Sequence, residues 1–223
     1  MSHDTLGPLL LSLEIAIAAT AIAGVIGVAV AALLANFRFP GRDLVDVVFT
    51  APLVMPPTVL GYYVLVALGR RSFLGQAFEA LTGTSIVFTR TGAVVAAVIG
   101  GLPLVVKSVR AGLEATDPAL VLAARTLGAT PLRAFSTIQL PLARRAVIAA
   151  LMLAFARSLG DFGVTLMVAG DIPGETQTAA LAIYDAIQAQ RDGDATTMIA
   201  ILTVGVGAIL YAVEKLTARE GAR

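Results

Sequence analysis

The chain has 223 residues, of which 57% are hydrophobic and only 14% are charged, with a formal net charge of +1. Soluble domains carry about 25% charged residues, whereas stretches such as residues 15–37 and 47–69 carry none at all. The balanced charge argues against a nucleic-acid binder, and the lack of cysteine excludes disulfides and thiolate metal sites. The composition therefore predicts an all-α polytopic membrane bundle.

Five membrane-spanning segments are expected in a single domain whose core covers residues 9–214. The predicted spans are residues 9–35, 47–68, 92–109, 146–169 and 195–213. The first span repeats small residues every four positions, which predicts a smooth face for close helix packing. These residues are Ala19, Ala23, Gly27, Ala31 and Ala35.

The second span contains Pro52, Pro56 and Pro57, which predict a bend because proline removes a backbone donor. The bend would lie beside a transport pathway or form a simple packing kink. Between the second and third spans, residues 70–90 contain Phe73, Leu74 and Leu81 at helical spacing. This pattern indicates a short helix on the membrane surface.

The fourth span contains Arg157 and Asp161, each costing about 2.5–3.5 kcal/mol at the centre of a membrane helix. Side chains four residues apart share a helix face, so these two charges can neutralise each other. One interpretation is an internal ion pair that only fixes packing. The other is a pathway or gate, to which Ser158 and Thr165 would add hydroxyl groups.

Basic residues are concentrated between the third and fourth spans and acidic residues between the fourth and fifth. The basic residues are Lys107, Arg110, Arg125, Arg133, Arg144 and Arg145. By the positive-inside rule, residues 110–145 and the C-terminus are expected in the cytoplasm and the N-terminus outside. Arg70, Arg71 and Arg90 fall on the outer side, against this trend.

The cytoplasmic loop is patterned as two short helices. Asp117 and Pro118 favour a helix start, and Gly128 favours the end of a helix over residues 119–127. Thr130 and Pro131 repeat this opening for a second helix that ends at Leu140 and Pro141. Such a knob fits a groove on a partner protein or folds back on its own spans.

The loop resembles the EAA loop of ABC-transporter permeases with the type I importer fold. The matching residues are Ala123-Ala124-Arg125-Thr126-Leu127-Gly128 and Ile138-Gln139-Leu140-Pro141. The resemblance implies a coupling helix that docks on a cytoplasmic ATPase dimer. Its implied coupling residues are Ala123, Ala124, Gly128, Leu132, Phe135, Ile138, Leu140 and Pro141. Leu122 stands where the family has a glutamate, so the polar part of that contact is not expected.

Residues 52–62, 155–163 and 172–178 are similar to the molybdate permeases, with sulfate permeases next and tungstate a further alternative. This resemblance implies a homodimer in the cell inner membrane and a periplasmic or lipid-anchored oxyanion-binding protein. It also implies that the chain binds no cofactor and that ATP is used by the partner subunit. Residues 101–108 superficially match a P-loop, but Val106 replaces its second glycine. An intramembrane enzyme or a scaffold is the remaining alternative.

Overall fold

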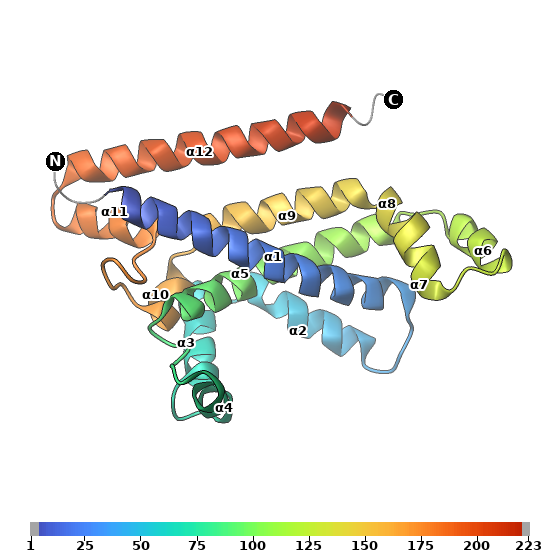
Figure 1. Ribbon diagram of the computed structural model, residues 1–223, viewed down its shortest axis with the longest axis horizontal. Coiled ribbons are helices and arrows are strands. Elements are labelled where there is room, and N and C mark those ends of the chain that lie inside the picture. The colour runs from blue at the N-terminus through green and yellow to red at the C-terminus, as the bar shows by residue number, and fades with distance from the viewer. Residues whose placement is uncertain (1–4, 220–223) are drawn as a thin grey trace.

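The computed structural model describes residues 5–219, which contain helices and no strand. Three long helices lie side by side along the long axis (Figure 1). They are α1 (Leu6–Asn36), α5 (Arg90–Glu114) and α9 (Arg144–Leu159). The expected all-α bundle is confirmed, and the rest of the chain is arranged around these three helices.

Small residues hold α1 against α5 and α9. Of the predicted smooth face, Ala19, Ala23, Gly27 and Ala31 are buried. A Cβ atom built on Gly27 would lie 2.6 Å from Val105 Cγ1, and one built on Gly24 would lie 2.7 Å from Leu151 Cδ2. The helices therefore approach closely because no side chain separates their backbones at these points.

The second predicted span, residues 47–68, is broken at the prolines where a bend was predicted. The structure has two helices there, α2 (Arg42–Val54) and α3 (Pro57–Leu68), which point in different directions (Figure 1). Met55 and Pro56 are extended between them, with ψ angles of 138° and 134°. Each of these residues precedes a proline, which disfavours helical ψ, so the chain breaks instead of bending.

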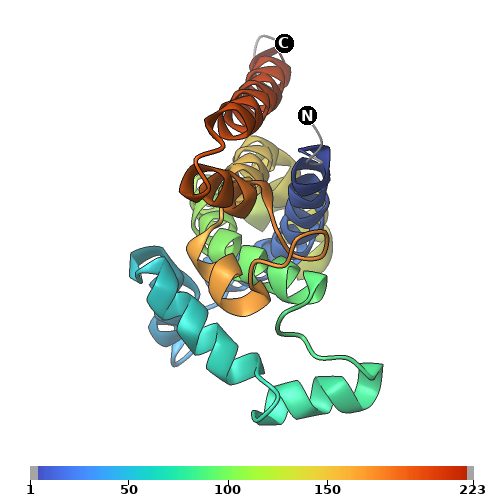
Figure 2. The same ribbon diagram turned by 90° about the vertical axis from the view of Figure 1, so that its left-hand side faces the viewer.

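The helix expected within residues 70–90 is α4 (Phe73–Thr82). It begins at Ser72, whose Oγ accepts a hydrogen bond from the Gly75 N–H at 2.9 Å, and it ends at Gly83 with φ of 74°. In Figure 2, α4 lies at the far side of the molecule from the C-terminal helix α12 (Asp192–Arg219). Its placement on the membrane surface remains a prediction.

The fourth predicted span, residues 146–169, is also divided into two helices. After α9 the chain breaks at residues 160–162 and continues as α10 (Gly163–Ala169). The helix α11 (Ala179–Gln188) was not expected at all. Gly160 and Gly163 weaken helix propensity here, and the Asp161 side chain replaces a helical bond at the start of α10.

Within residues 5–219, three helical segments are each long and apolar enough to cross a membrane: α1, α5 and residues Asp192–Tyr211 of α12. A fourth candidate is the pair Pro131–Leu142 and Arg144–Leu159, whose two parts are bent by 72°. The expected count of five is reached if α2–α3 and α9–α10 each cross as a broken pair. That count stays a prediction.

Replacing Gly27 by alanine should lower the thermal unfolding midpoint of the purified chain in detergent. The new methyl group would overlap the fully buried Val105, an overpacking that costs about 1–3 kcal/mol. Gly205→Ala is the matched control, because a Cβ atom there has nothing within 4 Å. Equal midpoints for the two variants would contradict the close packing of α1 on α5.

Candidate functional site

The cytoplasmic loop predicted from the sequence forms a compact helical unit at one end of the molecule (Figure 1). Its first helix is α6 (Pro118–Thr126), close to the predicted bounds. The Asp117 carboxylate accepts a hydrogen bond from the Ala119 N–H at 2.9 Å. Gly128 follows the helix with φ of 90°, a conformation that glycine adopts without steric cost. The predicted cap and stop are both confirmed.

The second half of the loop extends further than expected. It comprises α7 (Pro131–Ala134), a π-helical turn η1 (Phe135–Gln139) and α8 (Leu140–Leu142). The predicted end at Leu140 and Pro141 is wrong by one residue, since the helix includes Leu142. The π-helical turn just before Pro141 is wider than an α-helical turn. It therefore leaves room for the proline ring, which would otherwise clash with the preceding turn.

The predicted coupling residues divide into an outward set and an inward set. Ala123, Gly128, Leu132 and Pro141 are exposed, while Ala124, Phe135, Ile138 and Leu140 are half-buried. Phe135 packs on the core around α5. It therefore anchors the loop to its own chain, whereas four leucines of α6, α7 and their connection are exposed. These are Leu120, Leu122, Leu127 and Leu132, with Leu127 89% and Leu132 75% exposed.

Gln139 belongs to the predicted motif but was not assigned a role. It is buried, and its side-chain amide donates a hydrogen bond to the Leu113 carbonyl at 3.4 Å. Leu113 lies in the last turn of α5, so this bond ties the loop to the membrane core. This contact could not be predicted from the sequence, because the partner of Gln139 lies 26 residues earlier in the chain.

Next to this contact, a network of charged side chains joins α2 to α5. Asp46 pairs with Lys107 at 3.1 Å and with Arg110 at 3.0 Å. Glu114 pairs with Arg110 at 2.8 Å and with Arg42 at 3.3 Å. The network fixes the first half of the broken passage α2–α3 at the end of α5 that leads into the loop.

The charges of the fourth passage meet as predicted. Arg157 Nη1 lies 2.9 Å from Asp161 Oδ1, although the helix break now separates the two residues. Asp161 Oδ2 also accepts hydrogen bonds from the Thr165 N–H at 2.9 Å and the Thr165 hydroxyl at 2.7 Å. Asp161 and Thr165 are each 2% exposed, whereas the Arg157 side chain is 35% exposed.

These contacts assign different tasks to the predicted gate residues. Both carboxylate oxygens of Asp161 accept hydrogen bonds, and those from Thr165 hold the start of α10. Arg157 retains an accessible guanidinium, and Gly100 of α5 leaves space beside it. Ser158 is 8% exposed, and its Oγ has no hydrogen-bond partner among the described residues.

The two helix breaks lie against each other. A Cβ atom built on Gly163 would be 2.8 Å from Pro57 Cβ, and one built on Gly61 would be 2.7 Å from Met167 Cβ. The second halves of the broken passages, α3 and α10, therefore pack as one unit. This pairing of breaks was not visible in the sequence, since the contacting segments are about a hundred residues apart.

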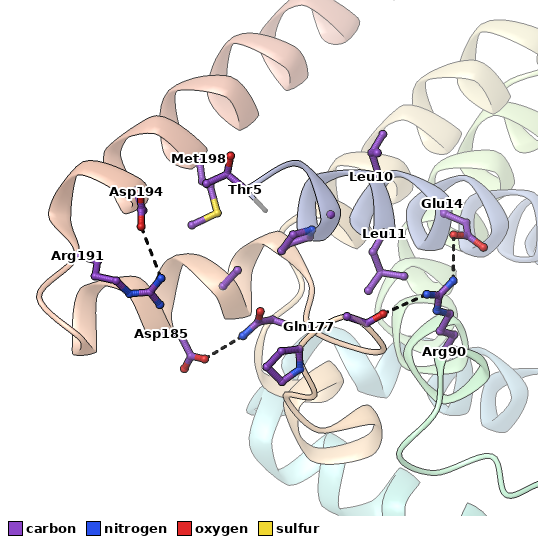
Figure 3. Close-up of a pocket in the computed structure, with 15 residues that line it drawn as sticks. Thr5, Leu10, Leu11, Glu14, Arg90, Gln177, Asp185, Arg191, Asp194 and Met198 are labelled. Atoms are coloured by element: carbon purple, nitrogen blue, oxygen red, sulfur yellow. Dashed lines mark hydrogen bonds and ion pairs between the residues drawn. The ribbon is translucent and has the colours of Figure 1, made fainter. Parts of the chain in front are cut away.

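At the end of the molecule away from the loop, a cavity of about 610 Å³ is lined by α1, the start of α5, α11 and α12 (Figure 3). Arg90 approaches Glu14 at 3.9 Å, and its guanidinium donates to the carbonyls of Gly174 and Glu175 at 3.2 Å each. None of the predicted site residues lines this cavity. Nearby, burial and the charge of Asp185 raise the pKa of Asp171.

Comparison with known proteins identifies the chain's family. The family of binding-protein-dependent transport system inner membrane components matches residues 23–219. The chain belongs to this family. It is therefore the membrane component of a transport system, and the sequence-based expectation of a multi-pass permease subunit that is not an enzyme is confirmed.

Among curated relatives, the molybdenum transport system permease protein ModB of Escherichia coli K12 is 40% identical over 210 residues. That match covers 94% of this chain and 92% of the relative. The sulfate transport system permease protein CysT of Salmonella typhimurium is 34% identical, covering 90% of this chain and 72% of the relative.

A solved structure of a bacterial ABC transporter involved in import of the polysaccharide alginate has a TM-score of 0.80 to this chain. The match covers 98% of this chain and 80% of that one at 14% sequence identity. At that identity the likeness concerns the fold alone. It confirms the expected fold of an ABC importer permease.

Thr165→Val should lower the thermal unfolding midpoint, because it removes a hydroxyl that donates to the buried Asp161 carboxylate. Hydrogen bonds to charged groups contribute about 1.5–3 kcal/mol. Thr20→Val is the matched control, since the Thr20 hydroxyl is buried and has no hydrogen-bond partner among the described residues. A Thr165 variant as stable as the Thr20 variant would contradict the structural task assigned to Asp161.

Proposed function

We propose that this chain is the permease subunit of an ATP-driven importer that carries an oxyanion, with molybdate as its substrate. The observation that carries the proposal is the 40% identity to a molybdenum permease over nearly the whole length of both chains. Two copies would form the pathway as a homodimer. A periplasmic or lipid-anchored binding protein would deliver the ion from outside, and a cytoplasmic ATPase dimer would supply the energy.

We propose that the whole chain forms one permease domain, with the loop of residues 110–145 in the cytoplasm. α1 begins and α12 begins at the end opposite the loop (Figure 1). With the loop inside, the N-terminus therefore lies outside and the C-terminus inside. The basic residues that surround the loop support this orientation through the positive-inside rule.

The outward leucines of α6 and α7 would contact the ATPase. Leu127 and Leu132 lie on the exposed surface of the loop, whereas Phe135 and Gln139 connect it to α5. A loop held on one side by its own core can transmit movement of the bound ATPase as a rigid unit. An apolar surface also suits Leu122, which cannot make the polar contact of a glutamate.

The double variant Leu127→Asp, Leu132→Asp should insert normally but lose the co-purifying ATPase. Charges placed on this surface would have to be buried without partners when the ATPase binds, which costs several kcal/mol. Leu6→Asp is the control, because Leu6 is 60% exposed at the opposite end of the molecule. Undiminished recovery of the ATPase with the double variant would overturn the proposed contact.

Arg157 is the side chain proposed to face the pathway. It is the accessible member of the group Arg157, Ser158, Asp161 and Thr165, and its second guanidinium nitrogen lies near the bare surface of Gly100. A partly exposed guanidinium lowers the barrier for a passing anion, while Asp161 keeps the arginine in position. The unpartnered Ser158 hydroxyl would add a donor beside it.

Arg157→Gln should reduce oxyanion uptake at least about tenfold, whereas Arg157→Lys should retain part of it. Loss of one charge stabilisation of about 1.4 kcal/mol in the barrier gives a tenfold change in rate. Uptake is measured in cells that produce equal amounts of each assembled complex. Uptake by the glutamine variant equal to that of the parent would remove Arg157 from the pathway.

Sulfate import is the second candidate, because the sulfate permease is 34% identical over 90% of this chain. Tungstate is a third, since it shares the shape and charge of molybdate. Growth rescue of strains that lack their own molybdate or sulfate permease separates these functions. Rescue of the sulfate strain alone would replace molybdate by sulfate in the proposal.

A further inference from the structure

Helix α4 exposes an apolar surface that no other described part of the chain covers. Phe73 is 84%, Leu74 55% and Leu81 87% exposed. The helix follows the apolar α3 after only four residues and projects from the main body (Figures 1 and 2). The preceding helix α3 is apolar along its length but is shorter than a membrane span.

Beside α4 lies a cavity of about 870 Å³, formed by the end of α3, the α3–α4 connection and residues 83–89. Its lining is divided by chemistry. Apolar walls are contributed by Leu65, Val66, Val87 and Phe88, and polar groups by Arg70, Arg71, Ser72, Thr84, Ser85 and Thr89. Such a cavity suits a ligand with an anionic group attached to an apolar chain.

Arg70 and Arg71 have few charged partners among the described residues of the protein. The Arg70 side chain is 70% exposed, and its ion pair with Glu79 is long, at 4.0 Å. Arg71 is exposed and has no ion pair or hydrogen bond among the interactions of the described residues. Exposed pairs of this kind contribute little stability, so both guanidinium groups are available to an external anion.

In the orientation proposed above, Arg70 and Arg71 lie on the outer side, where basic residues are normally depleted next to membrane spans. Two adjacent arginines at that level gain by pairing with an anionic headgroup, since guanidinium matches phosphate geometry in a bidentate manner. A free oxyanion would pair with the arginines but would make no contact with the apolar walls of the cavity.

We propose that the cavity formed by the end of α3, the α3–α4 connection and residues 83–89 binds an anionic phospholipid. Arg70 and Arg71 hold the phosphate, Phe73 and Leu81 enter the interface, and the acyl chain follows Leu65 and Val66. The site would anchor the second half of the broken passage α2–α3, which packs on α10. The lipid site does not depend on which oxyanion the chain carries.

The chain contains no tryptophan, so Phe73→Trp introduces a single fluorescent reporter on α4. The full-length variant is reconstituted alone into vesicles in which brominated phosphatidylglycerol or brominated phosphatidylcholine is present at matched mole fractions. We expect brominated phosphatidylglycerol to quench half of the fluorescence at a mole fraction at least about fivefold lower than brominated phosphatidylcholine requires. One arginine near an anionic lipid contributes about this factor in affinity. Leu81→Trp repeats the measurement at the other end of α4 if the first variant fails to insert.

Adding Arg70→Gln and Arg71→Gln to the reporter chain should make the two lipids quench equally. Arg38→Gln is the control and should keep the preference, because Arg38 is an exposed arginine that follows α1 at the opposite end. Equal quenching in the parent reporter chain overturns the proposal. Absence of quenching by either lipid also overturns it and would indicate that protein covers α4. Uptake measured separately reports on oxyanion transport, so failure of either idea is distinguishable.

Discussion

The close approach of α1, α5 and α9 through alanine and glycine is the constraint on which the rest of the structure depends. In lipid, apolar helices gain little by meeting one another, so association relies on close packing contacts. Gly24 and Gly27 bring α1 directly onto side chains of α9 and α5, and Gly112 brings α5 onto Ala146. This rigid core leaves the remaining helices to be attached by other means.

The contacts that attach the remaining helices differ between the two halves of the broken pairs α2–α3 and α9–α10. Near the loop of residues 110–145, α2 is tied to α5 by Asp46, Lys107 and Arg110, and the loop is tied to α5 by Gln139. Beyond the breaks, α3 and α10 pack on each other through Gly61 and Gly163. The loop is therefore connected to α2 through α5 and its charged side chains, whereas α3 and α10 form a separate packed pair.

Features that depend on residues within one helix could be predicted from the sequence, whereas contacts between distant segments could not. The spacing of Ala19, Ala23 and Gly27, and the cap at Asp117, each involve residues within one helix, so the sequence alone reveals them. The break at residue 160 was missed because Arg157 and Asp161 also fit one continuous helix. The pairing of Asp46 with Lys107 spans 61 residues and depends on how α2 meets α5.

As the ion pathway of an ATP-driven importer, this chain should support molybdate uptake into vesicles that also contain its ATPase and its binding protein. We expect this uptake to require ATP, the binding protein and the chain together. Uptake in complete vesicles that is no greater than in vesicles lacking this chain would show that the chain does not form the pathway.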